Sequence, residues 1–175
     1  MNNAKKYSLI LFISLFAYSL FAQVDNHPLL CSYSPDGPDS DCNYYAQDLT
    51  IQPDGSFLIV GHSISEEKQD VFLGRLNADG TPDRYFGERG VVRLNFDPDK
   101  RATAAKVIYH NARVYIAGNL GTNTFVACLK PGGNPDQEFG KNGICFNEKL
   151  NLIKDLAAYN TVQGSRLVLA GASFD

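Results

Sequence analysis

Residues 72–90 read FLGRLNADGTPDRYFGERG, and residues 125–143 read FVACLKPGGNPDQEFGKNG, which is the same pattern written a second time. Every shared residue recurs 53 positions later. A fixed period of about 50 residues is typical of proteins built from stacked or radially arranged units. The positions that define the repeat are Phe72, Leu76, Gly80, Asp83, Phe86, Gly87 and Gly90 in the first copy, and Phe125, Leu129, Gly133, Asp136, Phe139, Gly140 and Gly143 in the second.

The composition is that of a folded protein rich in strands and turns. Of the 175 residues, 44% are hydrophobic and 20% are charged, which is enough apolar content to bury a core. Eleven phenylalanines, nine tyrosines and fifteen glycines against one methionine favour strands and turns over helices. The formal net charge is −3 and lysine and arginine do not cluster, which argues against nucleic acid as a partner.

The first 22 residues have the pattern of a secretory signal peptide. Lys5 and Lys6 precede the apolar run Leu9–Phe16, and Ala22 supplies a small residue before Gln23. We therefore expect cleavage between Ala22 and Gln23. The mature protein is then secreted, periplasmic or attached to the cell surface.

Two alternatives stand beside this interpretation. Cleavage near Ala17–Ser19 is a second choice. A membrane anchor is the other, but a spanning helix needs about 20 apolar residues and this run is shorter. We expect no membrane span after the signal peptide is removed.

Export places the four cysteines where disulfides persist. Cys31 and Cys42 bracket the turn-rich run at 34–41, and a bond between them closes a short loop easily. Cys128 and Cys145 fall on neighbouring predicted strands and form a second candidate pair. The alternative for Cys128 and Cys145 is that both are small buried hydrophobic residues. A zinc site is disfavoured because no C-x-x-C motif occurs.

The chain after a predicted N-terminal loop at 23–45 divides into short strands and turns. The first unit contains apolar segments followed by Pro53-Asp54-Gly55 and by Asn77–Gly80, which are turn sequences. The polar run 62–70 is predicted to be a surface loop. The predicted strands of this unit are 46–51, 57–60, 71–76 and about 90–94.

The second unit follows the same plan, and the third follows its first half. His110–Arg113 takes the place of the first turn, and Lys130–Gly133 takes the place of the second. The third unit pairs residues 155–159 with 166–171. We place the units at about 46–98, 103–150 and 154–175, the last truncated.

Four short antiparallel strands per unit predict the blade of a β-propeller. The fold class is therefore all-β, a partial β-propeller of about two and a half blades, and an ordinary β-sandwich is the alternative. Two and a half blades leave an open edge, because a closed ring takes about four or more. We expect this edge to be covered by further blades of a longer chain or by another chain.

The pattern resembles the delta-60 repeat of bacterial secreted proteins, a family also described as a domain of unknown function with a β-propeller fold. The residues that carry the resemblance are 51–61, 75–83 and 86–92. The second unit departs from the pattern at His110–Arg113 and at Lys130–Gly133. The resemblance covers about residues 46–175 and implies a propeller. It implies no reaction, because the family has no established catalytic residues to carry over.

One segment resembles the motif that carries the nucleophilic serine of a hydrolase. Gly61-His62-Ser63-Ile64-Ser65 follows an apolar segment, as the G-x-S-x-G elbow of α/β-hydrolases does. The fifth residue is Ser65 in place of glycine, and no apolar-periodic helix follows. The repeat plan alone accounts for Gly61, so we disfavour the hydrolase interpretation.

The remaining polar residues give no constellation of catalytic or ligand groups. Asp36, Asp39 and Asp41 lack the spacing of a calcium-binding EF-hand loop. Asp83 and Asp136 occur once per unit at a fixed turn, which is typical of a capping or turn acceptor. We name no catalytic, cofactor-binding or metal-binding residue and expect no cofactor.

The function favoured by the sequence is that of an exported bacterial β-propeller repeat module, a binding or structural scaffold with no catalytic site of its own. The alternative is an exported hydrolase or lyase that acts on carbohydrate through carboxylates on the propeller face, because fold alone does not decide function. The expected partner is a protein, a glycan or further blades of a longer chain.

Overall fold

The computed structural model describes residues 12–14, 17–24, 27–32, 43–65, 68–96 and 99–174. All regular secondary structure within these ranges is β-strand, and no helix there has the length and apolarity to span a membrane. The strands are β1 (Phe12–Ser14), β2 (Ala17–Val24), β3 (His27–Ser32), β4 (Asn43–Ile51), β5 (Phe57–Ser65), β6 (Lys68–Leu76), β7 (Val91–Leu94), β8 (Ala102–His110), β9 (Arg113–Leu120), β10 (Asn123–Leu129), β11 (Ile144–Asn147), β12 (Leu152–Thr161) and β13 (Gly164–Ala172).

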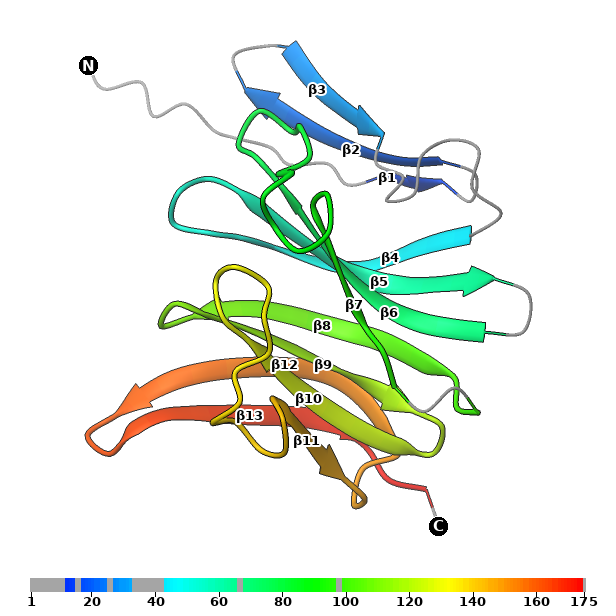
Figure 1. Ribbon diagram of the computed structural model, residues 1–175, viewed down its shortest axis with the longest axis vertical. Coiled ribbons are helices and arrows are strands. Elements are labelled where there is room, and N and C mark those ends of the chain that lie inside the picture. Colours follow the sequence, from blue (N-terminus) through cyan, green and yellow to red (C-terminus); the bar gives the residue numbers. More distant parts are fainter. Residues whose placement is uncertain are drawn as a thin grey trace.

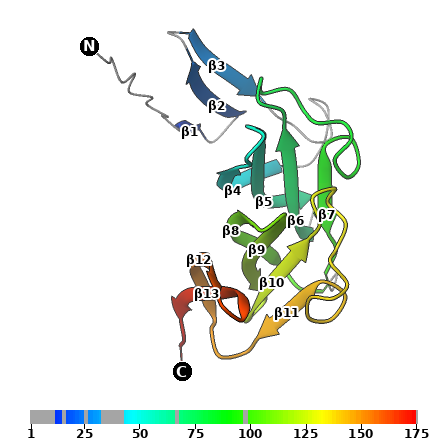
Figure 2. The ribbon, with the colours of Figure 1, turned by 90° about the vertical axis from the view of Figure 1, so that its left-hand side faces the viewer.

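The strands from β4 onward form three antiparallel sheets that follow the sequence repeat. Strands β4–β7 form a four-stranded sheet in chain order, β8–β11 form a second, and β12 pairs with β13. We call these the first, second and third units. They lie one after another in chain order (Figure 1), with β4, β8 and β12 along one side and β7 and β11 along the other (Figure 2). The all-β fold predicted from the sequence is confirmed, and the arrangement is that of a partial β-propeller.

The core lies between successive sheets, because each strand points alternate side chains to opposite faces. Leu58 and Val60 of β5 share one buried cluster with Val114 and Ile116 of β9. We call the face of a unit that turns toward the following unit its front face, and the opposite face its back face. The front face of the first unit is thus covered by the back face of the second.

The second unit covers its front face in the same way. Tyr115 and Ala117 of β9 share a second buried cluster with Ile153 and Leu156 of β12. In the third unit, Val168 is the residue that corresponds to Tyr115, and it is 49% exposed. In all three units the second strand therefore points alternate side chains to the front and back faces. Whether the front-face side chains are buried depends on whether a following unit covers them.

After its third strand, each four-stranded unit makes the same tight corner. The N–H of Phe86 donates to the carbonyl of Asp83, and Phe139 donates to Asp136 in the same way. The corner needs glycine at Gly87 and Gly140, whose φ angles are 54° and 56°. A Cβ there would lie 2.2 Å and 2.3 Å from the carbonyl oxygens of the residues four positions on. Sterics thus account for these repeat glycines.

The two corner phenylalanines differ in burial. Phe86 has no exposed surface, whereas Phe139 is half-buried. A Cβ on Gly133 would lie 3.2 Å from the ring of Phe86, so the turn that follows β10 covers that ring. Because the local backbone is the same, the difference comes from the neighbouring unit.

The polar run 62–70 is not the surface loop that we expected. Strand β5 continues to Ser65 and β6 begins at Lys68, with Ser63 paired with Asp70. Main-chain pairing stabilises a strand whose side chains are polar, so apolar periodicity underestimates strand length.

The loop expected at 23–45 is also interrupted by strands. Strand β3 (His27–Ser32) pairs with β2, and β4 begins at Asn43. Tyr44 is 8% exposed and packs edge-on against the ring of Phe72, with 5.5 Å between ring centroids. That aromatic contact extends β4 beyond its predicted start.

The predicted signal-cleavage site lies within β2. Ala22 pairs with Leu29 and Gln23 pairs with Pro28 of β3. Lys5 and Lys6, the predicted basic region, lie outside the described residues. Cleavage between Ala22 and Gln23 stays a prediction.

The hairpin between β8 and β9 turns through Asn111 and Ala112, with φ angles of 49° and 55°. Two successive positive φ angles define the tight turn that favours Asn-Gly, and Ala112 carries a Cβ that opposes this conformation. The substitution Ala112→Gly is expected to stabilise the protein by about 1 kcal/mol. The measurement is urea unfolding followed by circular dichroism.

Ala157→Gly serves as the matched control. Ala157 lies on β12 with an exposed side chain, so glycine there is expected to destabilise the protein by about 0.5–1 kcal/mol. If both variants lose stability equally, the turn does not have this conformation.

Candidate functional site

A five-residue turn with the same hydrogen-bond pattern occurs three times in the structure. It covers residues 52–56, 77–81 and 130–134. In each, the first N–H donates to the last carbonyl at 2.8 Å, and the N–H of the glycine donates back to the first carbonyl at 2.9 Å. The turns predicted at Pro53-Asp54-Gly55, Asn77–Gly80 and Lys130–Gly133 are therefore confirmed.

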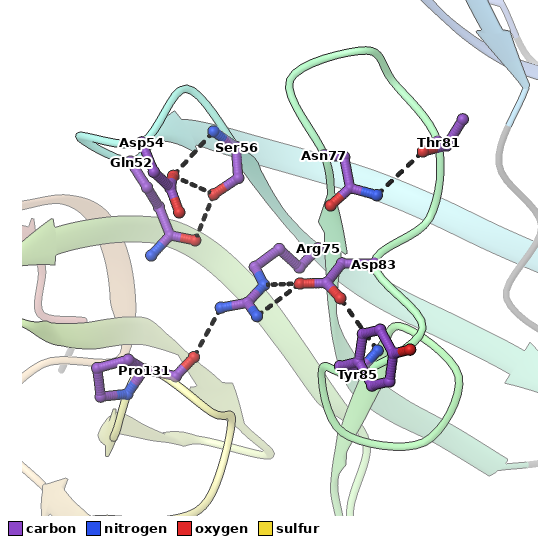
Figure 3. A network of polar contacts seen from close by, with 9 residues as sticks. All are labelled: Gln52, Asp54, Ser56, Arg75, Asn77, Thr81, Asp83, Tyr85 and Pro131. Atoms are coloured by element: carbon purple, nitrogen blue, oxygen red, sulfur yellow. Dashed lines mark hydrogen bonds and ion pairs between the residues drawn. The ribbon is translucent and has the colours of Figure 1, made fainter.

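Two of these turns contain an aspartate bound by a hydroxyl residue. Oδ1 of Asp54 accepts hydrogen bonds from the N–H and hydroxyl of Ser56 at 3.0 and 2.6 Å. Asp79 accepts the same two bonds from Thr81 at 2.9 and 2.7 Å. The hydroxyl bonds lower the pKa of both carboxyl groups. Both carboxylates are thus engaged in holding their own turns, and Figure 3 shows the contacts of Asp54 with Ser56.

Asp83 and Asp136 hold the two corners. Asp83 accepts the N–H of Tyr85 at 3.0 Å and Asp136 accepts that of Glu138 at 3.3 Å, which is the turn-acceptor role that the sequence indicated. Each also binds an arginine that the sequence analysis missed. Nε of Arg75 donates to Asp83 at 2.7 Å, and Nε of Arg113 donates to Asp136 at 2.6 Å.

The two arginines come from different strands. Arg75 is on β6, and Nη1 also donates to the carbonyl of Pro131 in the second unit at 2.8 Å (Figure 3). Its guanidinium lies 4.5 Å from the ring centroid of Phe86. The repeat position of Arg75 is Cys128 in the second unit, so Arg113 on β9 supplies the cation there. The hydrogen bond from Arg113 lowers the pKa of Asp136.

The disulfide considered between Cys128 and Cys145 is not formed, and both thiols are free. The register pairs Cys145 with Val126, which places Cys128 diagonally from Cys145. Diagonal positions are about 7–8 Å apart, too far for ordinary disulfide geometry. Cys128 is buried, and burial raises the pKa of its thiol to about 11, which makes it inert. The Cys31–Cys42 pair lies outside the described side chains.

The first strands of the units carry a row of alternating charges, which we call the inner row: Asp48, Lys106 and Asp155. Each follows a register shift in its strand, between Ala46 and Asp48 in β4 and at the corresponding places in β8 and β12. Nζ of Lys106 lies 3.6 Å from Asp48 and 3.9 Å from Asp155. The β-bulge re-aims these side chains toward the neighbouring unit.

The inner row joins the first and second units through the main chain as well. Oδ2 of Asp48 accepts the N–H of Val107 at 2.9 Å. Asp155 is 68% exposed at its side chain, and its Oδ1 accepts the N–H of the next residue, Leu156, at 2.9 Å. The inner row therefore connects units, and its last member accepts a bond within its own strand.

A second polar group lies where the hairpins of the second and third units turn. The Oδ1 atom of Asn160 lies 3.0 Å from Nε2 of His110 and 2.8 Å from Nδ2 of Asn111. Asn111 also donates to the hydroxyl of Ser165 at 2.8 Å. These exposed amide, imidazole and hydroxyl groups bind one another and thereby connect the two units.

Ser63 is not the nucleophile of a hydrolase. Gly61-His62-Ser63-Ile64-Ser65 lies inside β5 and continues as strand, so the strand-to-helix turn that exposes such a serine is missing. Ser63 is 5% exposed. The side chain of His62 stacks on Tyr45 at 5.2 Å between ring centroids. This motif belongs to the sheet.

In the part of the chain that the structure describes, no group of three or more histidine, cysteine, aspartate and glutamate side chains is close enough to hold a metal ion. Asp36, Asp39 and Asp41, which we weighed for calcium, lie outside the described residues. The polar contacts of the described residues named above hold turns, corners and adjacent units.

Comparison with known families adds one finding. The family model described as a β-propeller domain of unknown function, DUF5122, matches residues 52–86. The match begins at the first five-residue turn and ends at Phe86 of the first corner. No curated protein and no solved structure matches the chain. The matched segment supports a β-propeller domain of unknown function.

His62 makes stability depend on pH. Its Nδ1 atom is buried without a hydrogen-bond partner among the described residues, and burial lowers the pKa of the imidazole below its ordinary value of 6.5. The unfolded chain therefore binds more protons than the folded chain as the pH falls below 6.5. We expect the urea concentration at the unfolding midpoint to decrease as the pH is lowered from 7.5 to about 5.5.

The matched variant is His62→Phe, which keeps an aromatic ring against Tyr45 and removes the titrating group. Its urea midpoint is expected to fall less over the same pH range than that of the unsubstituted protein. Equal pH dependence in both proteins would show that His62 is not the group responsible.

Proposed function

We propose that the protein is an exported repeat module of the delta-60 type, which acts as a binding or structural scaffold and has no catalytic site of its own. Its place of action is the periplasm, the cell surface or the medium. The partner is a protein, a glycan or further blades, bound through the turns at the strand ends or through the open edge.

One observation carries this proposal: the polar groups that recur between units hold the fold together. Asp83 and Asp136 each bind an arginine and a main-chain N–H at a corner. Asp48 binds the main chain of the second unit. A repeated carboxylate with a structural partner favours a scaffold over a reacting group.

The inner row contains two carboxylates near each other, so it is the place to consider the carbohydrate-hydrolase alternative. A glycosidase needs two carboxyl groups on either side of a glycosidic bond, separated by about 5–10 Å. Asp48 lies on the first unit and Asp155 on the third, and Nζ of Lys106, on the second unit between them, lies 3.6 Å and 3.9 Å from their carboxylates. The ammonium group thus occupies the space in which a scissile bond would lie.

The experiment uses the full chain expressed in a bacterial host, with recovery from the periplasm and the medium. The exported form is expected to begin at Gln23, read by N-terminal sequencing. That form is then incubated with soluble xylan, pectin and β-glucan, and released reducing ends are measured. We expect no release above that of buffer, either from the unsubstituted protein or from Asp48→Asn, which preserves side-chain shape.

Two results would contradict the proposal. Retention of the chain in the cytoplasm with residues 1–22 intact would contradict the proposal that the protein is exported. Release of reducing ends by the unsubstituted protein, lost in Asp48→Asn, would replace the scaffold with an enzyme.

A further inference from the structure

Strand β13 has one edge paired with β12 and one edge beside which the described residues place no strand. The N–H of Leu156 donates to the side chain of Asp155, so the main chain of Leu156 points away from β13. Paired residues of antiparallel strands point either toward each other or apart. Leu169, the partner of Leu156, therefore presents its N–H and carbonyl to the free edge, as do Leu167 and Gly171.

The corresponding edges of the first two units hold a third strand in one fixed register. An aromatic residue lies opposite the glycine, and a leucine lies four residues further on. The pairs are Phe72 with Gly61 and Leu76 with Phe57 in the first unit, and Phe125 with Gly118 and Leu129 with Val114 in the second. In the third unit the same positions are Gly171 and Leu167, 53 residues after Gly118 and Val114.

In all three units this glycine lies close to a main-chain oxygen of the first strand, 2.0–2.2 Å from where a Cβ would be, and in the second unit it also lies under the aromatic ring opposite it. A Cβ on Gly118 would also lie 2.9 Å from two ring atoms of Phe125, so the ring of the third strand packs over the glycine. The residue midway between the aromatic residue and leucine is small in both units, namely Gly74 and Ala127. The pattern that fits this edge is therefore aromatic-x-small-x-leucine.

The turn after the third strand completes the contact. Gly133, four residues after Leu129, lies against the ring of Phe86, and a Cβ there would lie 2.5 Å from Cγ2 of Val92. The corresponding surface of the second unit is formed by Phe139, which is half-buried, and by Cys145, which is exposed. Phe139 and Cys145 stand at the repeat positions of Phe86 and Val92, which the turn of the second unit covers.

We infer that the free edge of β13, with Phe139 and Cys145, is a strand-acceptor site. Its occupant is an extended segment with the pattern aromatic-x-small-x-leucine and a glycine four residues after the leucine. The segment adds antiparallel to β13, and its main-chain hydrogen bonds and alternate side chains provide affinity and register. This inference rests on the proposed function, because it names the partner class of the scaffold edge.

The test uses the full chain and a labelled synthetic peptide with the sequence of residues 122–135, carrying Cys128→Ser to prevent oxidation. We expect saturable binding by fluorescence anisotropy. Amide hydrogen exchange is expected to slow at Leu167, Leu169 and Gly171. A control peptide with Phe125→Ser and Leu129→Ser is expected to bind at least about tenfold more weakly, because it cannot fill the apolar positions.

A matched pair of protein variants isolates the edge. Leu169→Pro and Leu169→Ala both lose the leucine side chain, but only proline also loses the N–H at the free edge. Leu169→Ala is expected to bind the peptide, and Leu169→Pro is expected to bind it at least about tenfold more weakly. Circular dichroism of both variants checks that the hairpin persists.

Three results would overturn the inference. They are equal binding of the two peptides, protection confined to other edges such as β11, and protection of the β13 amides by self-association without peptide. The last result would make a second copy of the chain the occupant. None of them bears on hydrolysis or export, so the scaffold proposal stands or falls separately.

Discussion

The structure depends on one constraint, which is that each small sheet has two apolar faces and buries them only against neighbouring sheets. Phe86, Val60 and Ile116 have no exposed surface because the first and second units pack face to face. Val168 of the third unit, on a front face without a following unit among the described residues, is 49% exposed. The stabilising free energy of apolar burial, about 25 cal/mol per Å², is therefore gained at the boundaries between units.

The sequence predicted what depends on local chemistry. Gly87 and Gly140 recur because the corner backbone excludes a Cβ, and Asp83 recurs because its turn needs an acceptor. The bond between Asp48 and Val107 was not predicted, because it joins residues of different units and depends on a β-bulge that leaves no residue signature. The extension of β5 to Ser65 was missed for a related reason, since main-chain pairing stabilises polar strands.

Arg113 illustrates how a repeat preserves an interaction while its residues change. The first unit supplies the cation for Asp83 from β6, whereas the second supplies that for Asp136 from β9, where Cys128 stands at the repeat position of Arg75. The corner has the same backbone geometry in both units, and in the second unit the aspartate binds an arginine from a different strand. The repeated carboxylates therefore serve the corners of both units.

The most direct test of this account compares Phe86→Ala with Phe139→Ala by equilibrium urea unfolding. The two rings occupy the same local corner and differ in what covers them, since Phe86 is fully buried and Phe139 is half-buried. The account predicts a loss of about 3–5 kcal/mol for Phe86→Ala and a clearly smaller loss for Phe139→Ala. Equal losses, or a larger loss for Phe139→Ala, would contradict the claim that packing between units stabilises the fold.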